Sequence, residues 1–142
     1  MPQAGSRAPR PGPAHRKRPA LTPRPRPAFM TVPDPDSAEI TPEDTAAWLA
    51  KAPADFQLVD CREPDEWALC RIDGATLVPL SQFAELAPSH LTPDRPVVVY
   101  CHHGMRSLRA THWLRSKGYE AWSLAGGIDA WSDLIDPAVP RY

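Results

Sequence analysis

Residues 97–117, with the sequence VVVYCHHGMRSLRATHWLRSK, constrain the fold of this chain more than any other stretch. The apolar run at residues 97–100 does not alternate with polar residues, which is typical of a strand covered on both faces in a parallel sheet. A helix pattern follows from residue 106, with its apolar side chains on one side, and Gly118 ends it. We therefore expect a buried central strand, a tight polar loop and a helix.

The loop after this strand has the composition of an anion-binding loop. Cys101 stands first, Gly104 lies in the middle, and Arg106 and Ser107 come where the helix begins. In open α/β sheets, ligands bind beyond the carboxyl ends of the strands, where backbone N–H groups and the positive end of a helix dipole converge. Gly104 permits a positive φ or a close backbone approach, and the guanidinium of Arg106 suits an oxyanion.

Cys101 is expected to be the nucleophile of this loop. A free thiol has a pKa of about 8.5, and a helix N-terminus with a nearby arginine lowers that pKa. The alternative is a buried structural cysteine, which the position between a strand end and a helix start disfavours. We expect a thiolate at neutral pH, held where anions bind.

Charge divides the chain into two unlike parts. Residues 1–30 contain seven Lys/Arg, no Asp/Glu and eight of the nineteen prolines, whereas residues 31–142 contain nine Lys/Arg against seventeen Asp/Glu. We expect residues 1–36 to form a disordered basic tail, unless translation starts at Met30, and residues 37–142 to form one domain. The acidic balance of that domain argues against nucleic acid as its partner.

The cysteines and the hydropathy indicate a soluble protein of the cytoplasm. Cys61, Cys70 and Cys101 are an odd number of cysteines at irregular spacing, with no secretory signal and no CxxC pair. No run approaches the roughly eighteen apolar residues that a membrane span needs. Cys61 and Cys70 are expected to be buried as small hydrophobes. A role as a resolving or relay thiol is the lesser alternative for both, slightly better for Cys70 because its segment is expected at the surface.

Strand and helix patterns alternate along the chain, with connections too long for hairpins. This alternation predicts a parallel sheet sandwiched between helices. Residues 88–96, which contain three prolines, are expected to form a surface connection. The expected strands cover residues 38–40, 56–61, 75–78, 97–100 and 121–124, and the expected helices run from Pro42 to before Pro53, over residues 63–69, around Phe83, over residues 106–117 and around Trp131.

Four separated motifs resemble those of single-domain rhodaneses, a family of sulfurtransferases, over about residues 37–134. Residues 60–66 are similar to the family's Asp-x-Arg-x-x-x-Glu, residues 72–75 to its Ile-x-Gly-Ala, residues 101–107 to its active-site loop, and residues 126–131 to its Gly-Gly-x-x-x-Trp. The resemblance implies an α/β, three-layer fold in which a five-stranded parallel sheet carries helices on both faces.

The resemblance also implies that Cys101 takes a sulfane sulfur from thiosulfate or a persulfide, carries it as a persulfide and passes it to a thiophilic acceptor. The donor and acceptor would be small sulfur compounds or a sulfur-carrier protein, and no cofactor is expected. Arg106 would orient an anionic donor. The persulfide would lie among the loop residues His102, His103, Gly104, Met105, Arg106 and Ser107.

The length of the cysteine loop distinguishes the sulfurtransferase hypothesis from the phosphatase and arsenate reductase alternatives. Phosphatases and arsenate reductases of related architecture place five residues between cysteine and arginine, whereas this chain has four, which suits a sulfur atom better than a tetrahedral oxyanion. His102 stands where many thiosulfate-using members have arginine, and this smaller positive charge favours a persulfide donor protein over thiosulfate. Cys70-Arg71 replaces the family's Gly-His, so the structural role of that histidine is not expected to carry over. A binding or relay module that takes sulfur only from a docked protein remains the other hypothesis.

Two further groups of polar residues receive structural interpretations. Asp60, Arg62 and Glu66 are expected to form an ion-pair cluster near the mouth of the site, with direct proton transfer as the alternative. His102 and His103, with His112, are not expected to bind a metal, because adjacent histidines in a tight loop would point apart and no carboxylate or second cysteine completes a set.

Overall fold

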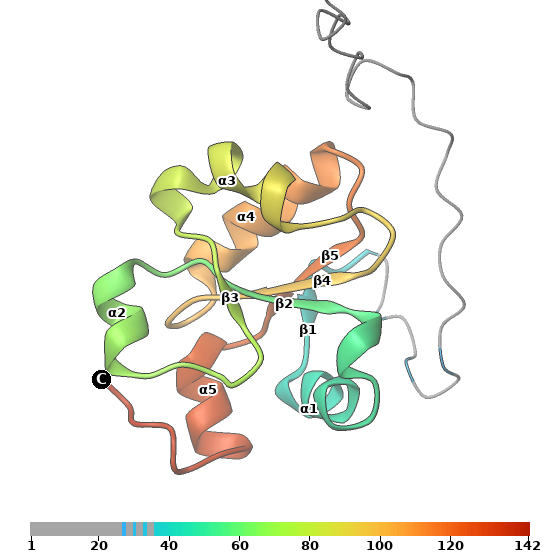
Figure 1. Cartoon of the computed structure of the whole chain (residues 1–142). Coiled ribbons are helices and arrows are strands. Elements are labelled where there is room, and N and C mark those ends of the chain that lie inside the picture. The colour runs from blue at the N-terminus through green and yellow to red at the C-terminus, as the bar shows by residue number, and fades with distance from the viewer. Residues whose placement is uncertain (1–26, 28–29, 31–32, 34–35) are drawn as a thin grey trace, which may run out of the picture.

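The computed structural model describes Pro27, Met30, Pro33 and residues 36–142, and places five strands in one sheet (Figure 1). The strand order is β1-β5-β4-β2-β3, and all neighbours are parallel, which confirms the predicted α/β fold. The strands are β1 (Glu39–Ile40), β2 (Gln57–Asp60), β3 (Thr76–Leu77), β4 (Val97–Tyr100) and β5 (Ala121–Leu124).

Helices lie on both faces of the sheet, so the three layers are confirmed as well (Figure 1). On one face α1 and α5 bury a cluster that contains Trp48 and Trp131, and on the other α3 and α4 bury a cluster that contains Phe83 and Leu114. The helices are α1 (Pro42–Lys51), α2 (Pro64–Leu69), α3 (Phe83–His90), α4 (Met105–Ser116) and α5 (Gly127–Leu134), with short 3-10 turns η3 (Pro53–Asp55) and η4 (Leu80–Gln82).

Strand β4 is the buried central strand that the apolar run predicts. It pairs with β2 on one side and β5 on the other, and all four of its residues are 0% exposed. Val97 and Val99 belong to the cluster under α3 and α4, whereas Val98 and Tyr100 belong to the cluster under α1 and α5. Because both faces of β4 are covered, the chain reaches the carboxyl edge of the sheet in a fixed position directly before Cys101.

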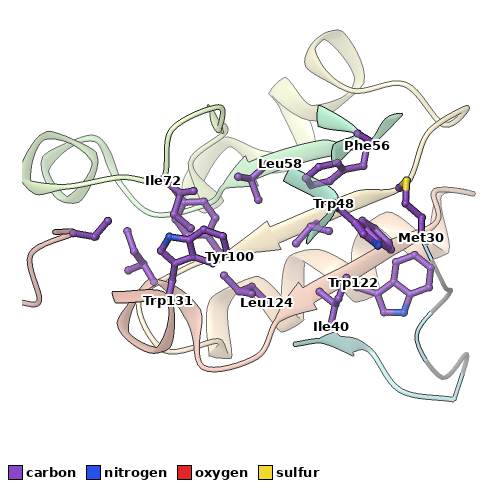
Figure 2. Packing of buried hydrophobic residues seen from close by; sticks show 14 of the residues in the cluster. Met30, Ile40, Trp48, Phe56, Leu58, Ile72, Tyr100, Trp122, Leu124 and Trp131 are labelled. Carbon is purple, nitrogen blue, oxygen red and sulfur yellow. The ribbon is translucent and has the colours of Figure 1, made fainter. Parts of the chain in front are cut away.

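The start of α1 follows its sequence signals. The side chain of Thr41 accepts a hydrogen bond from the Asp44 N–H at 3.0 Å, and Pro42 occupies the first turn. Figure 2 shows Trp48, from this helix, within the aromatic cluster, where it meets Phe56 edge-on with ring centroids 5.5 Å apart.

Some helix boundaries differ from those predicted. Helix α3 continues through Pro88 to His90, so the connection to β4 is shorter than the expected stretch from residue 88. The proline removes only one backbone donor, and the side chains of Ser89 and His90 both bond to the Leu86 carbonyl, at 3.0 and 2.8 Å, which supports the last turn. Helix α4 begins at Met105, one residue before the predicted start.

The expected tail over residues 1–36 falls largely outside the described residues. Met30 is among those that are described, and its side chain is 3% exposed. It belongs to the same cluster as Trp48 and Trp122, at the end of the sheet opposite the Cys101 loop (Figure 2). The core therefore includes a residue that precedes the boundary expected at residue 37.

Candidate active site

The loop from Cys101 to Gly104 joins the carboxyl end of β4 to the N-terminus of α4. Gly104 has a φ of +111°, which confirms the positive φ expected there, and this turn folds the backbone back over the cysteine. The Cys101 side chain is buried, with 1% of the residue exposed. Ser107 is fully buried beneath it and bonds to Ser123 of β5 at 2.7 Å, so the loop is tied to the neighbouring strand.

Backbone N–H groups converge on the Cys101 sulfur. The N–H of Gly104 donates to Sγ at 3.1 Å and the N–H of Ser107 at 3.3 Å, while the Ser107 hydroxyl lies 3.3 Å away. A hydrogen bond from the Cys61 thiol, followed by those of Ser107 and Gly104, lowers the pKa of Cys101 to about 5 against the opposing effect of burial. The geometry is that of a thiolate at neutral pH.

Cys61 is a site residue that the sequence analysis did not select. It follows β2 as Cys101 follows β4, it is 0% exposed, and it belongs to the same buried cluster as Cys101. Hydrogen bonding to the Cys101 sulfur, with burial, raises the pKa of Cys61 far above its ordinary value, so Cys61 is the protonated partner. The expectation that Cys70 lies in a surface segment was wrong, because Cys70 is buried in the cluster on the opposite face of the sheet.

Arg106 forms a two-point ion pair with Glu66. Its Nη1 and Nη2 donate to Oε1 and Oε2 at 2.7 and 2.9 Å, and the two side chains are 33% and 16% exposed. This pairing lowers the pKa of Glu66 to about 2 despite partial burial. The guanidinium that was expected to face an anionic donor is thus already paired with a carboxylate, and the pair joins the first turn of α4 to α2.

Asp60 and Arg62 form a second, separate ion pair. Both side chains are 0% exposed, and Arg62 donates to the carboxylate through Nη2 at 2.7 Å and through Nε at 3.0 and 3.1 Å. Arg62 Nη2 also donates to the backbone carbonyl of Cys70 at 2.6 Å. A pair this buried, with its donors used on neighbouring backbone, has the contacts of a structural element.

Tyr142 links the two ion pairs, a role that no motif in the sequence indicated. Its hydroxyl accepts from Arg62 Nη1 at 2.9 Å and donates to Glu66 Oε2 at 2.8 Å. Its ring stacks on the imidazole of His102, with centroids 3.9 Å apart. Tyr142 therefore connects the expected cluster of Asp60, Arg62 and Glu66, and Glu66 itself pairs with Arg106 in the first turn of α4.

The Gly126-Gly127 turn at the start of α5 holds the loop from the other side. The N–H groups of Ile128 and Asp129 donate to the carbonyls of Cys101 and His102 at 2.8 and 3.1 Å. A Cβ placed on Gly127, whose φ is +65°, would collide with those same two carbonyls. This contact explains why a motif some twenty residues downstream accompanies the cysteine loop.

The histidines do not point apart as expected. His102 and His103 stack with centroids 3.9 Å apart, and ligand atoms of both lie within 4.8 Å of one another and of the Asp129 carboxylate. The premise that no carboxylate completes a set was therefore wrong. Asp129 is also held by Arg141 through two bonds of 3.0 Å, so its carboxylate already has a partner.

The family model of the rhodanese-like domain matches residues 41–134 of this chain. The chain belongs to the rhodanese family. The match covers α1 to α5 and includes the loop at Cys101, the Gly126-Gly127 turn and the pair formed by Asp60 and Arg62. The resemblance expected from the motifs is confirmed.

Named relatives of this rhodanese domain are consistent with the assignment. The chain is 39% identical over 90 residues to the rhodanese-like/PpiC domain-containing protein 12, chloroplastic, of Arabidopsis thaliana, which covers 61% of the chain but only 30% of the plant protein. It is 38% identical over 81 residues to a protein named sulfurtransferase from Allochromatium vinosum, covering 57% of the chain and 74% of that protein.

A solved structure supports the same fold. The rhodanese-related protein of Thermoplasma volcanium superposes with a TM-score of 0.63 at 27% sequence identity, covering 73% of this chain and 98% of that one.

In the part of this rhodanese chain that the structure describes, no helix is both long and apolar enough to cross a membrane.

Proposed function

We propose that this rhodanese domain is a sulfurtransferase in which Cys101 carries the transferred sulfur as a persulfide. The observation that carries the proposal is the convergence of the Gly104 and Ser107 N–H groups on Sγ, at 3.1 and 3.3 Å. These donors stabilise the thiolate that attacks the donor. The same field of N–H donors would stabilise the negative charge of a persulfide formed on Sγ.

The transfer takes two steps. In the first, the Cys101 thiolate attacks the outer sulfur of the donor, an S–S bond forms to Sγ, and the donor's own bond to that sulfur breaks to release sulfite or a thiolate. In the second, a thiophilic acceptor such as a thiolate or cyanide attacks the same outer sulfur, and the Cys101 thiolate leaves. Two half-reactions with a covalent intermediate predict ping-pong kinetics.

The donor we propose is a persulfide, on a small molecule or on a sulfur-carrier protein, in preference to thiosulfate. Arg106 is the cation that was expected to orient thiosulfate, and the Glu66 carboxylate, 2.7 Å away, already compensates its charge. His102 occupies the position directly after the cysteine and is stacked between His103 and Tyr142. A site with this charge balance attracts a dianion less strongly than one with two free arginines.

The phosphatase and arsenate reductase alternatives are disfavoured by the same loop. Four residues separate Cys101 from Arg106, and the cradle formed by Gly104 and Ser107 already contacts the sulfur itself. The name of the Allochromatium vinosum relative supports transfer of sulfur.

We place the activity in the cytoplasm, with no nucleic acid or membrane as partner.

Intact-mass spectrometry tests the proposal directly. Incubation of the reduced chain with a persulfide donor should add one sulfur, about 32 Da, and cyanide should remove it as thiocyanate. Cys101→Ser should abolish the adduct, and Cys70→Ser, the matched control, should keep it. Absence of a cyanide-labile adduct after both thiosulfate and persulfide treatment would overturn the proposal.

A relay module that accepts sulfur only from a docked protein is the second candidate, favoured by the compensated charge of Arg106. Steady-state turnover with thiosulfate and cyanide separates the two. Turnover near background from a chain that is persulfidated on Cys101 would favour the relay, whereas turnover dependent on Cys101 would favour the enzyme.

A further inference from the structure

Cys61 and Cys101 stand at matching positions at the ends of two neighbouring strands. The register pairs Asp60 of β2 with Tyr100 of β4, and the N–H of Cys61 donates to the Tyr100 carbonyl at 3.0 Å. Val59, Cys61, Val99 and Cys101 all belong to the cluster under α3 and α4. The next pair of residues beyond the ladder is therefore two cysteines whose side chains point to the same face.

The spacing of this pair suits a disulfide. Neighbouring strands lie about 4.7–4.9 Å apart, and disulfides join residues whose Cα atoms are about 4.4–6.8 Å apart. Both cysteines are buried in the same cluster, so their side chains lie on one face of the sheet at the ends of two paired strands. This placement allows the two sulfurs to bond without a change in strand order or register.

We propose that Cys61 is a resolving thiol that converts an oxidised Cys101 into a reversible intramolecular disulfide. A hydroperoxide, hydrogen peroxide being the simplest, first oxidises the Cys101 thiolate to a sulfenic acid and leaves as hydroxide or alcohol. Cys61 sulfur then attacks Cys101 Sγ, the S–O bond breaks, and the hydroxyl departs with the Cys61 proton as water. An external dithiol reduces the disulfide and restores both thiols.

The charge on Cys101 makes the attack by Cys61 selective for the oxidised cysteine. While Cys101 is a thiolate, the adjacent negative charge and hydrogen bond keep Cys61 protonated and unreactive. Oxidation of Cys101 to a protonated sulfenic acid removes the thiolate charge that holds the Cys61 proton. A persulfide keeps a negative charge on its outer sulfur. Cys61 therefore resolves the oxidised cysteine and leaves a bound sulfane sulfur in place.

The consequence is protection of a vulnerable nucleophile. A cysteine whose pKa is lowered to about 5 is a ready target for hydroperoxides, and further oxidation to sulfinic acid is irreversible for most proteins. Cys61 intercepts the sulfenic acid before that happens. This inference goes beyond sulfur transfer, because it requires only the thiolate and its buried neighbour.

The test is oxidation of the full, reduced chain with a small molar excess of hydrogen peroxide, followed by intact-mass and non-reducing peptide analysis. We expect a loss of about 2 Da, a linked peptide pair containing Cys61 and Cys101, and full recovery with dithiothreitol. Cys70→Ser, which alters a cysteine on the opposite face of the sheet, should form the same disulfide. Cys61→Ser keeps a hydroxyl donor toward Cys101 and should instead gain oxygen at Cys101.

The result with the wild-type chain tests the proposed Cys61–Cys101 disulfide even if a variant folds poorly. Oxidation of Cys101 straight to sulfinic acid without the 2 Da loss would overturn the proposal, as would a disulfide that includes Cys70 or joins two chains. A chain that fails to take up sulfane sulfur yet forms the Cys61–Cys101 disulfide would support the resolving role and contradict the proposed sulfurtransferase function.

Discussion

The phenol ring of Tyr142 lies nearly parallel to the imidazole of His102, with the planes 9° and the centroids 3.9 Å apart. His103 stacks on the other side at the same centroid distance, so the residue directly after Cys101 is held between two rings. The hydroxyl of Tyr142 meanwhile contacts both Arg62 and Glu66. One side chain thus joins the cysteine loop to both ion pairs beneath it.

Tyr142 should therefore stabilise the loop by two separable contacts. Tyr142→Phe keeps the stacking on His102 and removes the hydroxyl, so we expect a loss of about 1 kcal/mol in the free energy of unfolding, limited because the residue is 41% exposed. Tyr142→Ala removes both contacts and should cost about 1–2 kcal/mol. Urea denaturation measures both. Equal stability of the wild type and the alanine variant would show that these contacts contribute nothing.

The lowered pKa of Cys101 predicts alkylation that is already fast in mildly acidic solution. Because only the thiolate reacts, the rate at Cys101 should rise through its pKa of about 5 and level off above it, whereas an ordinary thiol gains rate up to about pH 8.5. Timed iodoacetamide labelling with peptide mass analysis gives the profile, with free cysteine labelled under the same conditions as the reference. A half-maximal rate near pH 8 would contradict the thiolate.

Cys61 is expected to help set that profile. Cys61→Ala removes the hydrogen bond that contributes most to lowering the pKa of Cys101, so the midpoint of the alkylation profile should move to higher pH. Cys61→Ser replaces the thiol with another donor of similar size and should shift the midpoint less. The same midpoint in both variants and the wild type would show that the neighbouring thiol has no effect.

Releasing Arg106 should improve the use of thiosulfate. Glu66→Gln removes the charge that compensates Arg106 and keeps an amide oxygen able to accept the Glu63 N–H. We expect a several-fold lower KM for thiosulfate, an effect that salt should weaken, at a stability cost of about 1 kcal/mol or less because the pair is partly exposed. Glu43→Gln, an exposed change of the same charge in α1, is the control. An unchanged or higher KM would mean that Arg106 does not face the donor.

Gly127 should be far less tolerant of a side chain than Gly118. Both have positive φ, but a Cβ on Gly127 meets the Cys101 and His102 carbonyls, whereas a Cβ on Gly118 meets nothing within 4 Å. Gly118→Ala should cost about 1–2 kcal/mol for the left-handed backbone alone. Gly127→Ala should cost more and also slow alkylation of Cys101. Thermal unfolding compares the two, and similar losses would contradict the close contact.

Local patterns were sufficient where neighbouring residues decide the structure. The unbroken apolar run of β4, the capping side chain of Thr41 and the positive φ of Gly104 depend on sterics and hydrogen bonding within a few residues. Helix α3 shows the limit of such patterns. Pro88 was expected to end it, but two side chains on the following turn bond to the Leu86 carbonyl and support the helix to His90.

The sequence alone determined the alternation of strands and helices, the loop that begins at Cys101 and the family to which its motifs belong, because these follow from short-range chemistry and from the order of motifs. The tertiary structure decided which distant groups meet. It paired Arg106 with Glu66, stacked Tyr142 on His102 and set Cys61, and not Cys70, against Cys101. These contacts depend on strand order and register, because the sheet places β2 beside β4 and the pleat selects the face on which each side chain lies.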